Sequence, residues 1–237
     1  MISIIIPTYG NRDILKSCVD SIIANTDMMK VQLIISANGC GDMEKYMSDI
    51  PYDDLIWEKD PVGFPSAINS GIKLAYGEFT ILLNNDSILK VSPFSWIDML
   101  LEPFNDEKVG ITGPAGCHAQ IFDNHTRQPI LDKKFISFAC AAIRTKLFEE
   151  IGTLDEVFNP GCGEDVDFCI RAQNKGYDVV KIPDENFPMI HLGAKTLKNP
   201  ILMSRVPLMI LNKWWYIIKD RYVKGHPDWY GGLSCYF

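Results

Sequence analysis

The stretch that decides the fold is ILLNNDSIL, residues 81–89, in which an apolar run stops at four polar residues. Such a run is typical of a strand that is buried on both faces of a parallel sheet. The polar cluster at residues 84–87 then marks the point where the chain leaves the core and turns. Because ligands of open parallel sheets bind beyond the carboxyl ends of the strands, this cluster is also a candidate binding site.

Strand and helix patterns alternate through the first half of the chain. Apolar runs predict strands at residues 2–6, 31–36, 55–58 and 78–83. Helical spacing of apolar residues predicts helices at residues 14–23, 42–49 and 66–76. Asn11 or Asp13 is the expected cap of the first helix, and Gly77 the expected end of the third. This alternation predicts an α/β fold with right-handed crossovers and a mostly parallel central sheet flanked by helices.

The second half of the chain is less regular. Helices are expected at residues 92–104, 146–151 and 164–175, the last ending at Gly176, and strands at residues 109–112 and 135–140. Residues 113–134 read as a polar, loop-rich segment over a site. Without low-complexity linkers or repeats, we expect one domain, residues 1–237. Its parts are a nucleotide-binding half (1–112), an acceptor half (113–199) and a helical aromatic extension (200–237).

Composition excludes several classes of protein. The 23 Lys and Arg against 30 Asp and Glu give a net charge of -7, so nucleic acid is not an expected partner. Seven cysteines, an odd number without a CxxC pair, disfavour a disulfide framework or zinc site and favour a reducing compartment. We find neither a secretory signal pattern nor an apolar stretch of the roughly 20 residues that a membrane helix needs. The expected location is the cytoplasm, with the cytoplasmic face of a membrane as an alternative setting.

Phosphate-binding loops of the common kinds do not fit the sequence. Gly39 and Gly41 follow a predicted strand, but the third glycine of a dinucleotide-binding loop is replaced by Glu44. No GxxxxGK[ST] loop is present either, so an ATPase is not indicated.

Asn84 and Asp86 form the first candidate constellation. In an extended chain, residues two apart turn their side chains to one face. Carboxylate and amide oxygens suit Mg²⁺ or Mn²⁺, which usually keep several waters and share phosphate oxygens of a substrate. A simple Asn/Asp turn is the alternative interpretation.

The second constellation is GCGEDVDFCIRAQNKGY, residues 161–177, which places three acids at the first turn of a predicted helix. The helix dipole favours carboxylates there, so capping explains at least one of them. Asp167 is spaced to pair with Arg171, four residues on. Glu164 or Asp165 is therefore a candidate for a role in binding or catalysis. His191, after the short run NFPMI, is a third candidate if it lies beside Asp86, and otherwise a structural histidine.

In order and spacing, four segments of the chain resemble the family 2 glycosyltransferases, inverting enzymes with the GT-A type fold. The segments are SIIIPTYGNRDILKSCVDSI, ANGCGD, VGFPSAINSGIKLAYGEFTILLNNDSIL and GEDVDFCIRAQNKGYDVVKIPDENFPMIH. They cover most of residues 2–195. The resemblance implies transfer of a sugar from a nucleotide diphosphate to an acceptor.

The resemblance also implies roles for residues on the nucleotide side. Pro7, Thr8 and Tyr9 would line the nucleotide site, and Gly63 and Asn69 would belong to the donor pocket.

On the metal side, Asn84 and Asp86 match the two acidic positions of the family's DxD motif. Asp86 would be the main metal contact, and Asn85 between them is counted with the donor-binding residues. His191 matches a further ligand near the diphosphate. Asp165 matches the general base, with Glu164 as the less favoured candidate.

The chain departs from the family pattern at two places. Ala37 stands where the family commonly has an acid that contacts the nucleobase, so Asn38 or Asp60 is the expected substitute. Gly10 follows the PTY triplet and displaces the family's asparagine to Asn11.

The implied reaction is a metal-assisted, inverting transfer of a hexose to a hydroxyl of a glycan, lipid-linked or protein-linked acceptor. The implied cofactors are Mn²⁺ or Mg²⁺ and a nucleotide-diphosphate sugar, with UDP-hexose favoured over GDP-mannose and dTDP-rhamnose. A catalytically silent GT-A domain that binds a nucleotide sugar or glycan is the main alternative. A nucleotidyltransferase is another alternative. It would be expected to have a phosphate loop rich in Gly and in Lys or Arg near the first strand, whereas PTYGNR has only one glycine and one arginine.

The extension carries an aromatic group, Trp214, Trp215 and Tyr216, flanked by Lys213 and Lys219. It could pack on the domain, form a homo-oligomer contact, or rest on a membrane as a peripheral contact.

Overall fold

The computed structural model describes residues 1–123, 129–183, 185–193 and 229–234 of the 237-residue chain. The expectation for the aromatic group at residues 214–216 therefore lies outside the described residues. Within the predicted helical extension, the described part is a strand, β12 (Trp229–Ser234). No helix among the described residues is long and apolar enough to cross a membrane.

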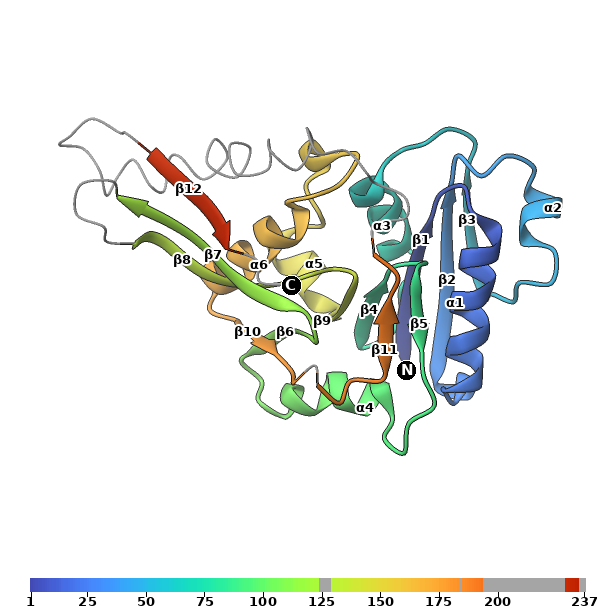
Figure 1. Cartoon of the computed structure of the whole chain (residues 1–237), viewed down its shortest axis with the longest axis horizontal. Coiled ribbons are helices and arrows are strands. Elements are labelled where there is room, and N and C mark those ends of the chain that lie inside the picture. The colour runs from blue at the N-terminus through green and yellow to red at the C-terminus, as the bar shows by residue number, and fades with distance from the viewer. Residues whose placement is uncertain (124–128, 184, 194–228, 235–237) are drawn as a thin grey trace.

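A seven-stranded sheet forms the centre of the molecule, in the order β10-β6-β9-β4-β1-β2-β3 (Figure 1). Its strands are β1 (Ile2–Thr8), β2 (Val31–Asn38), β3 (Asp54–Glu58), β4 (Phe79–Leu83), β6 (Val109–Gly113), β9 (Cys140–Arg144) and β10 (Asp178–Lys181). β9 runs antiparallel to both β4 and β6, whereas the other neighbouring strands of this sheet are parallel. The predicted α/β architecture with a mostly parallel sheet is confirmed.

Six α-helices are described around the sheet. They are α1 (Arg12–Ala24), α2 (Met43–Met47), α3 (Phe64–Ile72), α4 (Trp96–Leu101), α5 (Lys146–Ile151) and α6 (Glu164–Lys175), with short 3-10 turns at Met28–Lys30, Glu102–Asn105 and Glu156–Phe158. Of the two candidate caps of α1, Asn11 is the one used, because its side chain accepts from the N–H groups of Asp13 and Ile14. Gly176 ends α6 in the left-handed conformation, as predicted.

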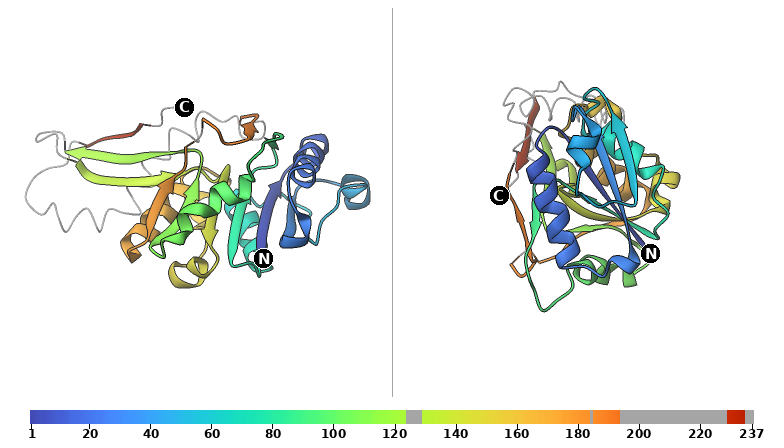
Figure 2. Two further views of the ribbon diagram at one scale, coloured as in Figure 1. Left: turned by 90° about the horizontal axis from the view of Figure 1, so that it is seen from below. Right: turned by 90° about the vertical axis from the view of Figure 1, so that its right-hand side faces the viewer.

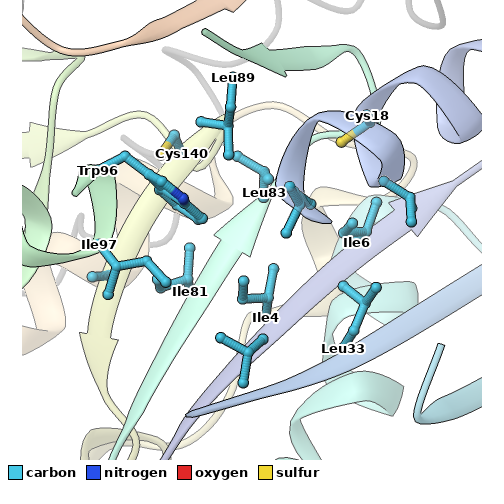
Figure 3. Close-up of a cluster of buried hydrophobic side chains, with 14 of the residues drawn as sticks. Ile4, Ile6, Cys18, Leu33, Ile81, Leu83, Leu89, Trp96, Ile97 and Cys140 are labelled. Carbon is cyan, nitrogen blue, oxygen red and sulfur yellow. The ribbon is translucent and has the colours of Figure 1, made fainter. Parts of the chain in front are cut away.

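The central strands are buried on both faces. Successive residues of β1 contribute to opposite cores, with Ile5 in one cluster and Ile4 and Ile6 in the other. Figure 3 shows the second cluster, in which Ile4 and Ile6 pack with Leu83 and Trp96. Burying a large aliphatic side chain contributes about 1.5–3 kcal/mol. These cores therefore hold the strand ends, and the polar residues that follow them, in fixed positions.

A β-hairpin replaces the loop expected at residues 113–134. Its strands are β7 (Gly116–Asp123) and β8 (Pro129–Ile136), and β12 pairs with β7. Ala119, Leu131 and Phe135 are buried against the core, so this polar-looking segment does alternate as a half-buried strand does. The hairpin lies at the β10 end of the sheet, opposite α1 and α2 (Figures 1 and 2). The strand expected at residues 135–140 is wrong in part, because β8 stops at Ile136 and β9 begins at Cys140.

Gly77 does not end α3, contrary to the expectation. The helix stops at Ile72, and Gly77 lies instead against β1, where its N–H donates to Ser3 Oγ at 2.9 Å. A Cβ at this position would come within 2.5 Å of the Ser3 nitrogen. The glycine is thus needed for close backbone approach rather than for capping.

Candidate functional site

The ends of three parallel strands bring the candidate residues to one edge of the sheet. β1 ends at Thr8, β2 ends at Asn38, and Asn84 directly follows β4. β1 pairs in parallel with both of the other strands, so these three positions share an edge. β9 starts at the same edge, because Cys140 pairs with Leu83.

The polar cluster after β4 forms a tight turn that faces His191. The Ser87 N–H donates to the Asn84 carbonyl at 3.1 Å, so this segment is a turn. The expectation that Asn84 and Asp86 lie on an extended chain is therefore wrong. Their side chains nevertheless converge. His191 Nε2 lies 2.9 Å from Asp86 Oδ1 and 3.3 Å from Asn84 Nδ2.

The position of His191 follows from a second small sheet. β11 (Met189–His191) pairs antiparallel with β5 (Ser87–Leu89), which places His191 opposite Ser87. The Leu192 N–H donates to the Asp86 carbonyl at 2.9 Å. Asp86 itself is only 4% exposed. The condition set for His191, that it lie beside Asp86, is therefore met.

The start of α6 carries two neighbouring carboxyl groups, of which Glu164 is buried and Asp165 is partly exposed. Burial raises the pKa of Asp165 to about 6, although the backbone N–H groups around it, including that of Val166 at 2.8 Å from Oδ1, favour the ionised form. Burial and the charge of Asp165 raise the pKa of Glu164 to about 8. Glu164 Oε2 has no hydrogen-bond partner among the described residues. Near neutral pH, Asp165 is thus the ionised member of the pair and Glu164 the protonated one.

Asp167, the third acid of this segment, has a structural role. It is fully buried and its Oδ2 pairs with Arg171 Nε at 2.9 Å, as the spacing of four residues predicted. Arg171 also donates to the carbonyls of Ile151 and Thr153, so the pair ties α6 to the end of α5.

Residues 137–139, between β8 and β9, connect the two constellations. The Asn84 N–H donates to the Ala139 carbonyl at 2.9 Å. The Phe138 backbone lies near the Asp165 carboxylate and lowers its pKa, against the effect of burial. The turn that carries Asp86 and the helix start that carries Asp165 therefore lie on either side of one three-residue segment. No pattern of residues in the sequence indicated that these segments meet.

Two of the predicted nucleotide-side residues are occupied by internal contacts. Asn38 is 5% exposed, its Nδ2 donates to the Thr8 carbonyl at 3.0 Å, and its Oδ1 accepts from the Val62 N–H at 3.2 Å. Pro7 and Thr8 are the last two residues of β1, and both are buried. Asn38 thus joins the end of β1 to the loop before α3, and its acceptor oxygen is engaged there rather than free to replace the acid expected at position 37.

Asn69 also serves the fold. Its amide forms a reciprocal pair with the backbone of Leu154, at 2.9 Å in both directions, and reaches Glu156 at 3.0 Å. Asn85 donates from Nδ2 to Thr8 Oγ1 at 2.9 Å. These two amides position neighbouring segments.

The exposed members of the predicted nucleotide side are Tyr9 and Asp60. Tyr9 is 45% exposed, and its ring lies so close to Gly39 that a Cβ there would be 2.8 Å from Cε2. Asp60 is exposed in the bend that precedes α3. Gly63 caps α3 with a positive φ of 88° and packs against Asn159, where a Cβ would meet Oδ1 at 2.5 Å.

The residues around His191 fit a divalent cation that is shared with a substrate. The described residues contain no group of three or more His, Cys, Asp or Glu side chains that could enclose a metal. Asp86, His191 and Asn84 offer one carboxylate, one imidazole and one amide, and the imidazole lies within hydrogen-bond distance of both other groups. Mg²⁺ and Mn²⁺ are commonly held by one or two carboxylates, with waters and phosphate oxygens completing the coordination.

The fold and the strand-end site define a GT-A type glycosyltransferase architecture. A mannosyltransferase from Pyrobaculum calidifontis, solved in complex with GDP-Man and Mn2+, has a TM-score of 0.57 at 17% identity, covering 95% of this chain and 76% of that chain. TarS 1-349 from S. aureus has a TM-score of 0.56 at 17% identity, covering 89% and 65%. The catalytic domain of Drosophila beta1,4galactosyltransferase 7 has a TM-score of 0.53 at 13% identity, covering 86% and 78%. These likenesses concern the fold.

The chain belongs to the family described as Glycosyltransferase like family 2, whose sequence pattern matches residues 1–198. It is 29% identical over 212 residues to the O-antigen biosynthesis protein RfbC of Myxococcus xanthus, covering 76% of this chain and 16% of that protein. It is 22% identical over 224 residues to the uncharacterized protein y4gI of Sinorhizobium fredii (strain NBRC 101917 / NGR234), covering 77% and 24%. The chain thus spans about a sixth and about a quarter of the length of these two relatives.

Proposed function

We propose that the chain is an inverting glycosyltransferase that moves a hexose from a nucleotide-diphosphate sugar to a hydroxyl group of a glycan, lipid-linked or protein-linked acceptor. The observation that carries the proposal is that the turn with Asp86 and His191 lies on one side of residues 137–139 and Asp165 on the other. One group can hold the leaving diphosphate while the other receives a proton. Membership of the glycosyltransferase family agrees with this assignment.

On the leaving-group side, Asp86, His191 and Asn84 would hold Mn²⁺ or Mg²⁺. When bound, such a cation offsets the charge that builds on the diphosphate oxygen as the bond to the sugar breaks. Asp86 supplies the only negative charge of the three side chains. Asn84, in the place of an acid, leaves more net positive charge for the phosphates.

On the acceptor side, the Asp165 carboxylate accepts the proton of the attacking hydroxyl group. The new bond forms at the anomeric carbon, on the face opposite the breaking bond to the diphosphate oxygen, so one displacement inverts the configuration. A pKa near 6 suits this task, because the carboxylate is ionised at neutral pH and yet more basic than an ordinary aspartate. Glu164, which holds its proton at neutral pH, adds no second negative charge beside it.

The alternative is a catalytically silent GT-A domain that binds a nucleotide sugar or glycan. Ala37 and Asn84 favour it, since both stand where the family commonly has an acid. Asn38 is engaged elsewhere and does not compensate for Ala37. The presence of Asp86, Asp165 and His191 in one connected region argues for catalysis.

A thermal-shift screen followed by a variant tests the proposal. UDP, GDP and dTDP sugars are added with and without Mn²⁺, since a ligand that binds only the folded state raises its melting temperature. UDP-hexose is the first donor to test, and GDP-mannose follows because the Pyrobaculum calidifontis neighbour was solved with GDP-Man and Mn2+. A donor that raises the melting temperature only with Mn²⁺ supports the proposal, and no metal-dependent shift with any donor contradicts it.

Asp165→Asn separates catalysis from binding. We expect it to lose about a hundred- to ten-thousand-fold in turnover while it keeps the donor-induced shift in melting temperature. Asp178→Asn, on the exposed start of β10, is the matched control. Near-normal transfer by Asp165→Asn would show that another group is the base. A wild-type protein that binds donor and transfers nothing supports the silent domain.

A separate experiment tests the acceptor and the location of the protein. We propose a lipid-linked acceptor at the cytoplasmic face of a membrane as the first case to test. Liposome flotation with and without residues 200–237 distinguishes a peripheral membrane contact from packing on the domain or on a second copy of the chain.

A further inference from the structure

A chain of three buried hydrogen-bonding side chains runs from the outer helix α2 to the turn that carries Asp86. Tyr46 OH lies 2.9 Å from Thr8 Oγ1, and Asn85 Nδ2 donates to the same oxygen at 2.9 Å. The exposed fractions of Tyr46, Thr8 and Asn85 are 5%, 2% and 7%. Buried polar groups of this kind are costly to leave unpaired, so each link constrains its neighbours.

The outer end of this chain is fixed by contacts of its own. α2 has only five residues, too few to be stable without tertiary contacts. The Tyr46 ring packs edge-on against Trp57, with 5.7 Å between ring centroids. Arg12 of α1 bonds to the Ser48 and Asp49 residues that follow α2. Tyr46 thus presents its hydroxyl group to Thr8 from a held position.

The inner end of the chain lies in the candidate metal site. Asn85 stands between Asn84 and Asp86, and its side chain points back to β1 while theirs converge on His191. The backbone of the same turn is held at Asn84 by Ala139, and at the Asp86 carbonyl by the N–H of residue 192. The Asn85 side chain adds a third attachment of this turn, to Thr8 of β1.

We propose that Tyr46, Thr8 and Asn85 are positioning residues that orient the 84–86 turn for metal-dependent binding of a nucleoside diphosphate. The inference rests on the proposed function for the identity of the ligand. Thr8 Oγ1 is the atom that the two contacts share. It accepts a hydrogen bond from Asn85 and forms another with the Tyr46 hydroxyl group. Loss of the Tyr46 hydroxyl frees Thr8 Oγ1 to rotate and weakens the hold on Asn85.

The functional test compares Tyr46→Phe with Tyr177→Phe, a control whose hydroxyl bonds to Glu150 near α5. Calorimetry measures the binding of UDP and of GDP with and without Mn²⁺. We expect Tyr46→Phe to weaken Mn²⁺-dependent binding about fivefold, as for the loss of one neutral hydrogen bond, and to leave metal-free binding unchanged. Tyr177→Phe should match wild type in both. Equal weakening with and without Mn²⁺, or no weakening at all, overturns the inference.

A double-mutant cycle tests the chain as a unit. If Tyr46 acts through Asn85, the combined Tyr46→Phe and Asn85→Ala protein binds the Mn²⁺-nucleotide no more weakly than Asn85→Ala alone. Additive losses would mean that Tyr46 acts by another route.

Amide hydrogen exchange in the ligand-free protein decides the structural part without any assumption about function. We expect Tyr46→Phe to speed exchange at residues 84–87 and Tyr177→Phe to leave it unchanged. Unchanged exchange at residues 84–87 in Tyr46→Phe overturns the positioning chain. If wild type binds no nucleotide, the proposed function fails, and the exchange result still decides for or against the chain.

Discussion

The buried Glu164 and its neighbour Asp165 make the stability of the fold depend on pH. Burial, followed by the charge of Asp165, raises the pKa of Glu164 from 4.5 to about 8. A carboxyl group whose pKa is raised on folding contributes its full stability below its unfolded pKa, and this contribution is lost as the pH rises through the folded value. Glu164→Gln removes the ionisable group. Between about pH 5 and about pH 8.5, the free energy of unfolding should therefore fall in wild type but not, through this group, in the variant.

The magnitude follows from the size of the pKa change. A tenfold change in an ionisation constant corresponds to about 1.4 kcal/mol, so a rise from 4.5 to about 8 amounts to at most about 5 kcal/mol. Asp165 contributes part of this cost through its own charge, and the two groups titrate as a pair. Between about pH 5 and about pH 8.5 we therefore expect the difference in unfolding free energy between variant and wild type to change by on the order of 2–4 kcal/mol.

Urea unfolding of both proteins across this pH range measures that difference. A constant offset from the new amide, which needs an acceptor for its N–H groups, cancels when the two pH values are compared. Glu149→Gln, on the exposed side of α5, is the control and should follow wild type at every pH. A stability difference between Glu164→Gln and wild type that stays the same within about 0.5 kcal/mol from low to high pH would refute the reasoning.

Three further predictions concern the site and its support. The kcat/KM for transfer should fall about tenfold per pH unit below about 6, because Asp165 then carries a proton and cannot accept one; a flat pH profile contradicts this assignment. Gly77→Ala should lower the free energy of unfolding by about 1–3 kcal/mol, since the new Cβ would lie 2.5 Å from the Ser3 nitrogen, and denaturant unfolding checks it. Arg171→Ala should cost about 3 kcal/mol by leaving the fully buried Asp167 without its guanidinium, and an unchanged melting temperature would contradict a supporting role.

The sequence predicted the central sheet because its strands have strong local patterns. ISIII and VQLIIS are mostly apolar, as is typical of strands with both faces buried, and ILLNND marks where a third such strand ends. The rule that ligands bind beyond parallel strand ends then located Thr8, Asn38 and Asn84 correctly on one edge. The helix starting at Glu164 was equally clear, from its acidic first turn and its terminal glycine.

What the sequence did not predict depends on contacts between distant residues. Asn84 bonds to the backbone of Ala139, and Asp165 lies near the backbone of Phe138. Such contacts with the backbone leave no mark on residue types. The roles of Asn38 and Asn69 were similarly hidden, because an asparagine that binds a ligand and one that binds a neighbouring loop look alike in sequence.

The hairpin of β7 and β8 was missed for a local reason. Its alternation of polar residues with Ala119, Leu131 and Phe135 is interrupted by several charged and glycine positions, so the period of two was obscured.

The antiparallel strand β9 has a consequence for biosynthesis of the protein. It fills the gap between β4 and β6, so the sheet remains in two pieces on the ribosome until residue 144 has been added. A nascent chain or fragment that stops at residue 112 would carry an open backbone edge on Phe79–Leu83, ready to pair with any exposed strand. Attempts to express the first half alone should therefore give aggregates.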